Sequence, residues 1–224
     1  MSDQPLVQFV DVEKGFPGRL PLYSNVNFAI SRGEFLFLTG VSGAGKSTIL
    51  RLILGLESPD RGRVLYNGYD VHRLPKKQYP KHLRSIGVVF QDYKLLGNKT
   101  AKENIGISLQ IKGIDGIRMG KRVEKIAHQI GIENLLGQSI SSLSGGEQQL
   151  VAIARAAVHR PLLILADEPT ANLDRQAAAK IMGILRKLHR ENIAVVISTH
   201  DFQVIKKHKI RTIVIKDSNL TTIQ

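Results

Sequence analysis

The sequence GVSGAGKST occupies residues 40–48 and matches the pattern G-x-x-x-x-G-K-[ST] at every fixed position. An apolar run at residues 34–39 (EFLFLT) precedes it and predicts a buried strand, and a run with helical apolar spacing at 49–56 (ILRLILGL) follows it. A strand, a glycine-rich loop and a helix, in that order, form the context in which this pattern binds phosphate. The alternative, a glycine-rich turn with a chance lysine, leaves the flanking strand and helix unexplained.

Each residue type in this stretch has a physical role in holding a triphosphate. Glycines let backbone N–H groups approach phosphate oxygens closely, and the following helix directs its positive end at the same anion. Lys46 can reach the β- and γ-phosphates, and the Ser47 hydroxyl can ligate Mg²⁺. The predicted nucleotide-binding residues are Gly40, Val41, Ser42, Gly43, Ala44, Gly45, Lys46, Ser47 and Thr48.

The composition is that of a globular protein with a large positive charge. The chain has 224 residues, 42% apolar residues, no cysteine and a formal charge of +13. Disulfides and cysteine-built metal sites are therefore excluded. The N-terminal residues lack a secretory signal pattern and no apolar run approaches the roughly 18 residues that span a bilayer, so we expect a cytoplasmic protein. The basic residues are scattered without interleaved aromatics, so their charge selects no partner among nucleic acid, membrane and solvent.

The order of the predicted elements indicates an α/β fold. Strands are predicted at residues 6–12, 22–30, 34–39, 63–66, 85–90, 162–166, 193–199, 211–215 and 220–223. Helices are predicted at 49–56, 147–158 and 176–191, and residues 92–141 have a helical character. We therefore predict a phosphate-loop NTPase core, a mostly parallel sheet flanked by helices. An N-terminal antiparallel β subdomain and an inserted α-helical subdomain complete it.

These elements predict one nucleotide-binding domain over residues 1–224. The nucleotide core and the β subdomain are expected at about 1–91 and 142–224, and the helical subdomain at about 92–141.

Polar side chains follow three of the predicted core strands. Asp167 and Glu168 come directly after the apolar run LLILA, where a carboxylate can hold Mg²⁺ and a second can polarise a water as general base. Gln91 and His200 also end predicted strands and can reach a γ-phosphate or its water. Beside a phosphate loop, these positions are more informative than lone acids or a lone histidine would be.

Ser144, Gly145 and Gly146 open another predicted helix and form a second phosphate-ready N-terminus. One triphosphate does not need two such sites in one chain. We therefore expect the second site to serve the nucleotide of another copy, with ATP sandwiched in a head-to-tail dimer.

In their order along the chain, GVSGAGKST, the Gln91 loop, LSGGE, LLILADEPT, ANLD and STHD resemble the nucleotide-binding cassette of ABC ATPases. The resemblance covers essentially the whole chain and implies ATP and Mg²⁺ as cofactors. It implies that Phe16 stacks on adenine, that Gln91 faces Mg²⁺ and the membrane partner, and that Asp174 belongs to the cross-dimer loop. The implied metal ligands are Ser47, Gln91 and Asp167, and the implied catalytic residues are Glu168, His200, Gln91 and Lys46.

Within the family, TGVSGAGKST, FQDYKLL and LSGGEQQ resemble the FtsE type of cell-division ATPase, which implies an FtsX-like integral membrane partner. The expected location is then the inner face of the cell membrane, through that partner, and no nucleic acid is expected. Lipoprotein-release and macrolide-export ATPases share much of the pattern, and a soluble ABC ATPase acting on nucleic acid is a further alternative. Three residues depart from the family pattern: Phe16, Leu150 and Ala171.

Overall fold

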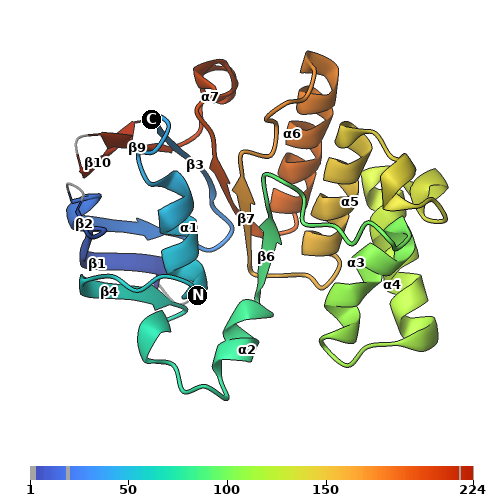
Figure 1. Ribbon diagram of the computed structural model, residues 1–224, viewed down its shortest axis with the longest axis horizontal. Helices are drawn as coiled ribbons and strands as arrows, with labels where there is room; N and C mark the ends of the chain where they lie inside the picture. Colours follow the sequence, from blue (N-terminus) through green and yellow to red (C-terminus); the bar gives the residue numbers. More distant parts are fainter. Residues whose placement is uncertain (1–3, 19–20, 217, 224) are drawn as a thin grey trace. The chain divides into compact units, whose positions relative to one another are not determined.

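The computed structural model describes residues 4–18, 21–216 and 218–223. Its internal contacts divide the chain into two compact units (Figure 1). Unit 1 comprises Met1–Leu83 and Ala194–Gln224, and unit 2 comprises Arg84–Ile193.

An antiparallel sheet in unit 1 has the strand order β2-β1-β4-β5. Its strands are β1 (Val7–Lys14), β2 (Tyr23–Ile30), β4 (Arg61–Tyr66) and β5 (Tyr69–Asp70). In β1, Val7, Phe9 and Val12 are buried, an alternation that the register shift between Phe9 and Val12 interrupts, as expected for a bulged strand with one face on a core. The predicted N-terminal antiparallel subdomain is therefore confirmed.

A second group of strands in unit 1 is mostly parallel. In it, β3 (Phe35–Gly40) lies between two parallel neighbours, β8 (Ala194–Ser198) and β9 (Thr212–Lys216). All six residues of β3 are buried, which explains its continuous apolar sequence. The strand β10 (Asn219–Ile223) pairs antiparallel with β9. Unit 1 also contains α1 (Lys46–Leu54), η1 (Val71–Arg73), α2 (Tyr79–Leu83) and α7 (Phe202–His208).

Unit 2 combines a parallel strand pair with a helical region. The strands β6 (Ile86–Val89) and β7 (Leu163–Asp167) are parallel, so the mostly parallel α/β arrangement predicted for the core is confirmed. The helices α3 and α4 both pack on α5. Figure 1 shows α3 and α4 in shades of green beside the yellow-orange α5. The helical elements are α3 (Ala101–Gln110), α4 (Gly116–Ile130), η2 (Glu133–Leu135), η3 (Ile140–Ser142), α5 (Gly145–Ala157) and α6 (Arg175–His189).

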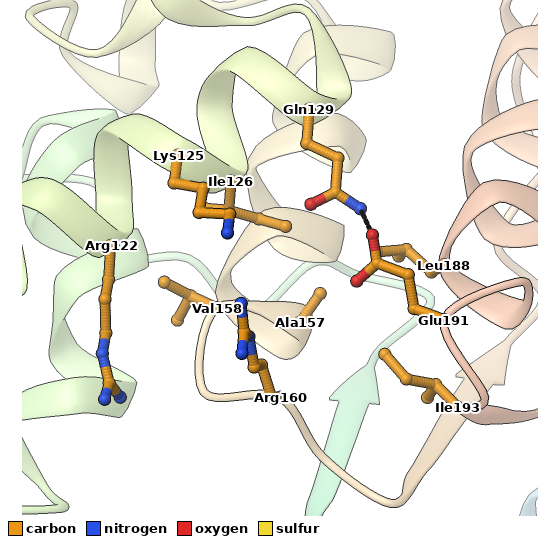
Figure 2. A pocket seen from close by; sticks show the side chains of 10 residues that line it. All are labelled: Arg122, Lys125, Ile126, Gln129, Ala157, Val158, Arg160, Leu188, Glu191 and Ile193. Carbon is orange, nitrogen blue, oxygen red and sulfur yellow. Dashed lines mark hydrogen bonds between the residues drawn. The ribbon is translucent and has the colours of Figure 1, made fainter.

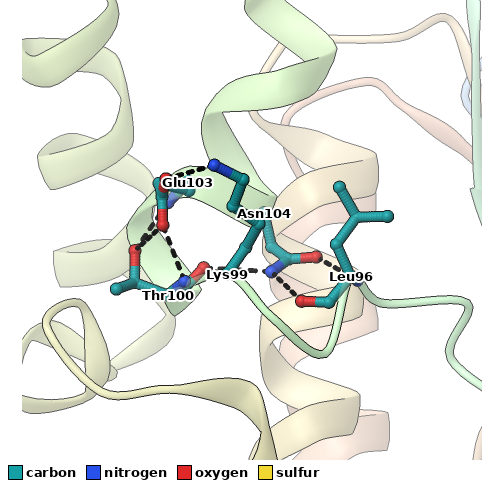
Figure 3. Close-up of polar contacts among 5 residues, drawn as sticks. All are labelled: Leu96, Lys99, Thr100, Glu103 and Asn104. Atoms are coloured by element: carbon teal, nitrogen blue, oxygen red, sulfur yellow. Dashed lines mark hydrogen bonds and ion pairs between the residues drawn. The ribbon is translucent and has the colours of Figure 1, made fainter.

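The start of α3 is fixed by a capping box that also anchors the preceding loop (Figure 3). Thr100 accepts a hydrogen bond from the Glu103 N–H at 3.2 Å, and the Glu103 carboxylate accepts one from the Thr100 N–H at 2.9 Å. The fully buried Asn104 then bonds the backbone of Leu96, accepting from its N–H at 2.7 Å and donating to its carbonyl at 3.1 Å. The loop before α3 is thereby tied to the helix.

Burial of His159, in the turn after α5, makes the stability of the fold depend on pH. Burial, and then the charge of Lys112, lower its pKa from 6.5 to about 4. Between these values the unfolded chain binds a proton at His159 that the folded chain does not, so stability is lost as pH falls from 6.5 towards 4. We expect this loss to be about 2–3 kcal/mol. Denaturant titrations at pH 6.5 and pH 4 should show this loss of stability. His159→Gln should remove the loss, whereas His128→Gln, the matched change at an exposed histidine, should not.

None of the helices within the described ranges is both long enough and apolar enough to cross a bilayer.

Candidate functional site

The glycine-rich loop at residues 40–48 links the buried strand β3 to α1. Gly45 adopts a left-handed conformation at φ 103°, and a Cβ there would lie 2.3 Å from the Tyr23 hydroxyl. A Cβ at Gly40 would lie 2.7 Å from the carbonyl oxygen of Ile215. These two positions therefore require glycine, and the loop sits directly at the N-terminus of a nine-residue helix.

Two side chains hold this loop from within unit 1. Lys46 is only 8% exposed, and its ammonium group donates to the carbonyls of Gly40 at 3.0 Å and Val41 at 3.3 Å. Tyr23 donates to the carbonyl of Gly45, and burial raises the pKa of its hydroxyl, so the donor proton stays in place. The cation therefore lies against the loop backbone, where the predicted phosphates would bind.

His200 lies at the same sheet edge as the glycine-rich loop. Leu38 of β3 pairs with Ser198 of β8 in parallel, so both strands end together and unit 1 brings the loop and His200 to one edge. Asp201 follows and caps α7, accepting from the Gln203 N–H at 2.8 Å. This cap fixes the backbone next to the histidine.

Phe16 lies in the turn after β1. Its side chain is 36% exposed, and the Lys14 ammonium sits 5.2 Å from the centre of its ring. Lys14 also pairs with Asp60 at 3.4 Å. An exposed ring with a cation over one face leaves the other face to stack on a planar ligand.

Unit 2 brings Gln91 and Asp167 into one hollow. The parallel register pairs Val89 with Ala166, so the residues that follow β6 and β7 emerge together. The hollow is lined by Phe90, Gln91, Asp92, Tyr93, Asp167 and Asn172. Its floor thus carries an amide and a carboxylate that offer oxygen ligands of the kind Mg²⁺ prefers.

Glu168 and Asp174 are held by the turn after β7. Glu168 has a left-handed backbone at φ 47°, a conformation that costs a non-glycine residue energy and clusters at functional sites. Its carbonyl accepts from the Ala171 N–H at 3.1 Å, so alanine completes the turn where the family pattern has glycine. Asp174 caps α6 and accepts from the N–H groups of Gln176 and Ala177, both at 2.8 Å.

Ser144 opens α5 through a second capping box. Its hydroxyl accepts from the Glu147 N–H at 3.4 Å and donates to the Glu147 carboxylate at 2.7 Å. Hydrogen bonds from the Ser144 hydroxyl and then from its backbone lower the pKa of that carboxyl. Gly145 lies close to Tyr93, because a Cβ there would be 3.2 Å from the tyrosine hydroxyl. The N–H groups at the start of α5 thus sit beside the Gln91 loop.

Arg155 of α5 clamps that same loop. Its two terminal nitrogens donate to the carbonyls of Tyr93 and Lys94, each at 2.6 Å. Both of these residues have left-handed backbones, at φ 58° and 49°. Burial lowers the pKa of the guanidinium, which still remains charged at neutral pH. One planar side chain therefore holds two consecutive strained residues, and it ties the loop to α5.

Arg155→Met should loosen this loop. Two carbonyls would lose a charged donor, so we expect the free energy of unfolding to fall by about 1–3 kcal/mol. Amide hydrogen exchange of residues 92–96 should accelerate more than that of α3, which Asn104 continues to anchor. Arg155→Lys serves as a control, because it keeps the charge but cannot bond both carbonyls in the fork geometry. Unchanged exchange in Arg155→Met would show that the clamp does not order the loop.

Sequence reasoning did not find Tyr23, Arg155 or Asn104. Tyr23 is distant in sequence from the loop that it contacts, and no local pattern marks it. Arg155 did leave a signal, since a lone arginine in the otherwise apolar EQQLVAIARAAV helix needs a backbone or acidic partner. Leu150, one of the departures from the family pattern, is 4% exposed and packs in the core.

The chain matches the family model described as ABC transporter over residues 23–171. Among curated proteins, it is 38% identical to the cell division ATP-binding protein FtsE of Escherichia coli K12 over 215 residues, which cover 96% of this chain and 97% of that one. FtsE of Bacillus subtilis is 36% identical, with 95% and 93% covered.

Solved structures agree with these sequence matches. The dimeric ATP-binding cassette MJ0796, in a post-hydrolysis state with ADP and phosphate, matches with a TM-score of 0.86 and 35% identity. The alignment covers 97% of this chain and 98% of that one. The cassette cbiO1 from Clostridium perfringens, part of the transporter complex cbiONQ, matches with a TM-score of 0.89 and 27% identity, covering 98% and 88%.

Proposed function

Because the chain belongs to the ABC transporter family, we propose that it is the ATP-hydrolysing subunit of a membrane complex and acts in cell division. The observation that carries the proposal is the match to FtsE proteins along 96% of the chain and 97% of their length.

ATP binding is assigned to residues 40–48. The α1 N-terminus and the loop N–H groups face the phosphates, and Lys46 neutralises part of their charge. Phe16 is assigned to the adenine ring, which its exposed face suits.

Each unit, taken by itself, offers side chains that suit Mg²⁺. In unit 2 these are the Gln91 amide oxygen and the Asp167 carboxylate of the hollow, and in unit 1 the Ser47 hydroxyl follows Lys46 in the glycine-rich loop. When bound, the ion offsets charge that develops on the phosphate oxygens. No cluster of three or more His, Cys, Asp or Glu side chains that could hold a metal occurs in the described part of the chain, which agrees with a site completed by phosphate and water.

Hydrolysis is assigned to Glu168 as the base that orients and polarises the attacking water, with His200 and Gln91 contacting the γ-phosphate region. The N–H groups of Gly145 and Gly146 and the Ser144 hydroxyl would close over the triphosphate of a second copy. Asp174 would lie in the loop that crosses the dimer. Two copies would then enclose two ATP molecules, and hydrolysis of ATP to ADP and phosphate would let the two copies separate.

The docking site for the membrane partner is assigned to residues 90–96 (FQDYKLL), where Phe90 and Leu96 are 36% and 42% exposed. An FtsX-like integral membrane protein docked there would place this chain at the inner face of the cell membrane. ATP-driven dimerisation would then transmit a signal across the membrane to cell-wall hydrolysis. No role for nucleic acid is proposed.

Affinity purification of the full chain from detergent-solubilised membranes tests the proposal. We expect a four-span partner with an extracytoplasmic loop to be retained. Leu96→Glu should release it, while Ile111→Glu, a matched change at a 59% exposed position outside the segment, should not. Capture of a partner with a large periplasmic export domain would contradict the division role and favour the lipoprotein-release or macrolide-export type.

A further inference from the structure

A pocket in unit 2 gathers positive side chains from two separate elements (Figure 2). Arg122 and Lys125 come from α4, and Arg160 comes from the turn after α5. In Figure 2 the Lys125 amino group and the Arg160 guanidinium point toward each other beside Val158. Buried apolar side chains line the pocket beside these three cations, and its other polar lining residues are Gln129 and Glu191.

These cations lack acidic partners. Among the residues that the structure describes, no carboxylate lies within 4.0 Å of Arg122, Lys125 or Arg160. The one carboxylate in the lining, Glu191, is already bonded to the Gln129 amide at 2.6 Å, which Figure 2 draws as a dashed line. Three cations and a single carboxylate leave the lining with a net positive charge, so an anion between the cations would gain free energy.

The positive field extends to a neighbouring, partly buried cation. Lys112 donates to the His159 carbonyl at 3.5 Å, next to Arg160 in sequence. Its pKa is lowered, first by burial and then by the charges of Arg122 and Arg84. The region therefore holds more positive charge than its own side chains can accommodate without cost.

The backbone at Arg160 indicates that the arginine is there for its side chain. Its φ of 52° is left-handed, a region that favours glycine, and Pro161 follows it. Its N–H bonds the Ala157 carbonyl at 2.8 Å, a contact that glycine would keep. An arginine at a position suited to glycine costs folding free energy and provides a fork of donors aimed into the pocket.

We propose that this pocket binds a phosphate-type oxyanion at a second site, separate from the glycine-rich loop, with Arg160 and Lys125 as its main ligands and Arg122 at its edge. Guanidinium and ammonium groups together suit a multiply charged phosphate group. The phosphate can belong to a soluble polyphosphate compound or to the headgroup of an anionic lipid.

Calorimetric titration with sodium tripolyphosphate tests the site, using the full chain saturated with Mg-ADP so that the glycine-rich loop is occupied. At about 0.15 M salt, where loose surface attraction is screened, we expect saturable binding of one ion per chain. Arg160→Gly and Lys125→Gln should each weaken it about tenfold or more. The thermal midpoint of Arg160→Gly should equal or exceed that of the wild type, so misfolding cannot explain the loss.

The double variant Lys76→Gln/Lys77→Gln is the matched control, because it removes two charges from the exposed 3₁₀–α2 connection of unit 1. Its tripolyphosphate affinity should stay within about twofold of the wild type. Unsaturable binding, an unchanged affinity in Arg160→Gly, or an equal loss in the control would each overturn the proposal.

Vesicles distinguish the two sources of phosphate. If phosphatidylglycerol vesicles retain the wild type but not Arg160→Gly, and phosphatidylcholine vesicles retain neither, the ligand is a lipid headgroup. If only tripolyphosphate binding depends on Arg160, the ligand is a soluble phosphate compound. Both outcomes support the site, whereas retention of both proteins alike, together with an unchanged tripolyphosphate affinity, would contradict it.

Discussion

Glu168→Gln is expected to lower steady-state ATP turnover by at least about 100-fold and to leave ATP binding unchanged. A positioned general base contributes about 10²–10⁴-fold to a reaction rate, and an amide of the same shape cannot accept the proton of the attacking water. Glu168 also has a left-handed backbone, a conformation that clusters at functional sites. Phosphate release at saturating Mg-ATP and the affinity for a fluorescent ATP analogue measure the two effects separately.

Glu133→Gln is the matched control for this substitution. Glu133 is an exposed acid of the same unit that pairs with His128 at 2.6 Å, and its loss should leave turnover within about twofold. If Glu168→Gln also retained full turnover, the base would have to be another residue, and the assignment of the turn after β7 to catalysis would be wrong.

Ser144→Arg is expected to reduce turnover by a comparable factor, about 100-fold, although Ser144 does not belong to the chain's own phosphate loop. The substitution places a long side chain over the start of α5 and removes the hydroxyl that the triphosphate of the second copy would contact. Nucleotide affinity of the isolated chain should change less than about threefold, because residues 40–48 are untouched. Turnover measured as a function of protein concentration tests this effect, because the substitution is expected to block the association of two copies and not the binding of nucleotide to one copy.

The chain offers a close control for the loss of the helix cap. Thr100 opens α3 with the same kind of capping box as Ser144, a hydroxyl and a glutamate three residues later. Thr100→Arg should cost a similar free energy of unfolding, about 1 kcal/mol, without an effect on turnover. Equal loss of activity in both variants would mean that Ser144 acts only on the stability of its helix.

Local patterns sufficed to predict the α/β fold class and the strands that precede the proposed site residues. The apolar run before residues 40–48 forms the fully buried β3, and the short apolar runs ending at Asp167 and Ser198 form the parallel strands β7 and β8. Each is a continuous apolar segment followed by polar residues, which is how buried parallel strands appear in a sequence. The polar residues at their ends therefore fall where the pattern predicts them.

Contacts between distant residues could not be predicted in this way. The helices α2 and α7 have only five and seven residues, too few for an apolar period to show. The pairing of Tyr23 with Gly45, and of Arg155 with Tyr93, depends on tertiary packing. The cap role of Asp174 does have a local signal, since an aspartate two residues before Gln176 and three before Ala177 is a common helix start.

The claim that each ATP site is completed by a second copy of the chain is tested most directly by the molar mass of Glu168→Gln in solution. Light scattering after size exclusion should give the monomer mass without nucleotide and twice that mass with Mg-ATP, because the variant binds ATP but cannot hydrolyse it. The double variant Glu168→Gln/Ser144→Arg should remain a monomer in both conditions. A monomer for Glu168→Gln with saturating Mg-ATP, or a dimer that forms equally well with Arg at position 144, would contradict the account.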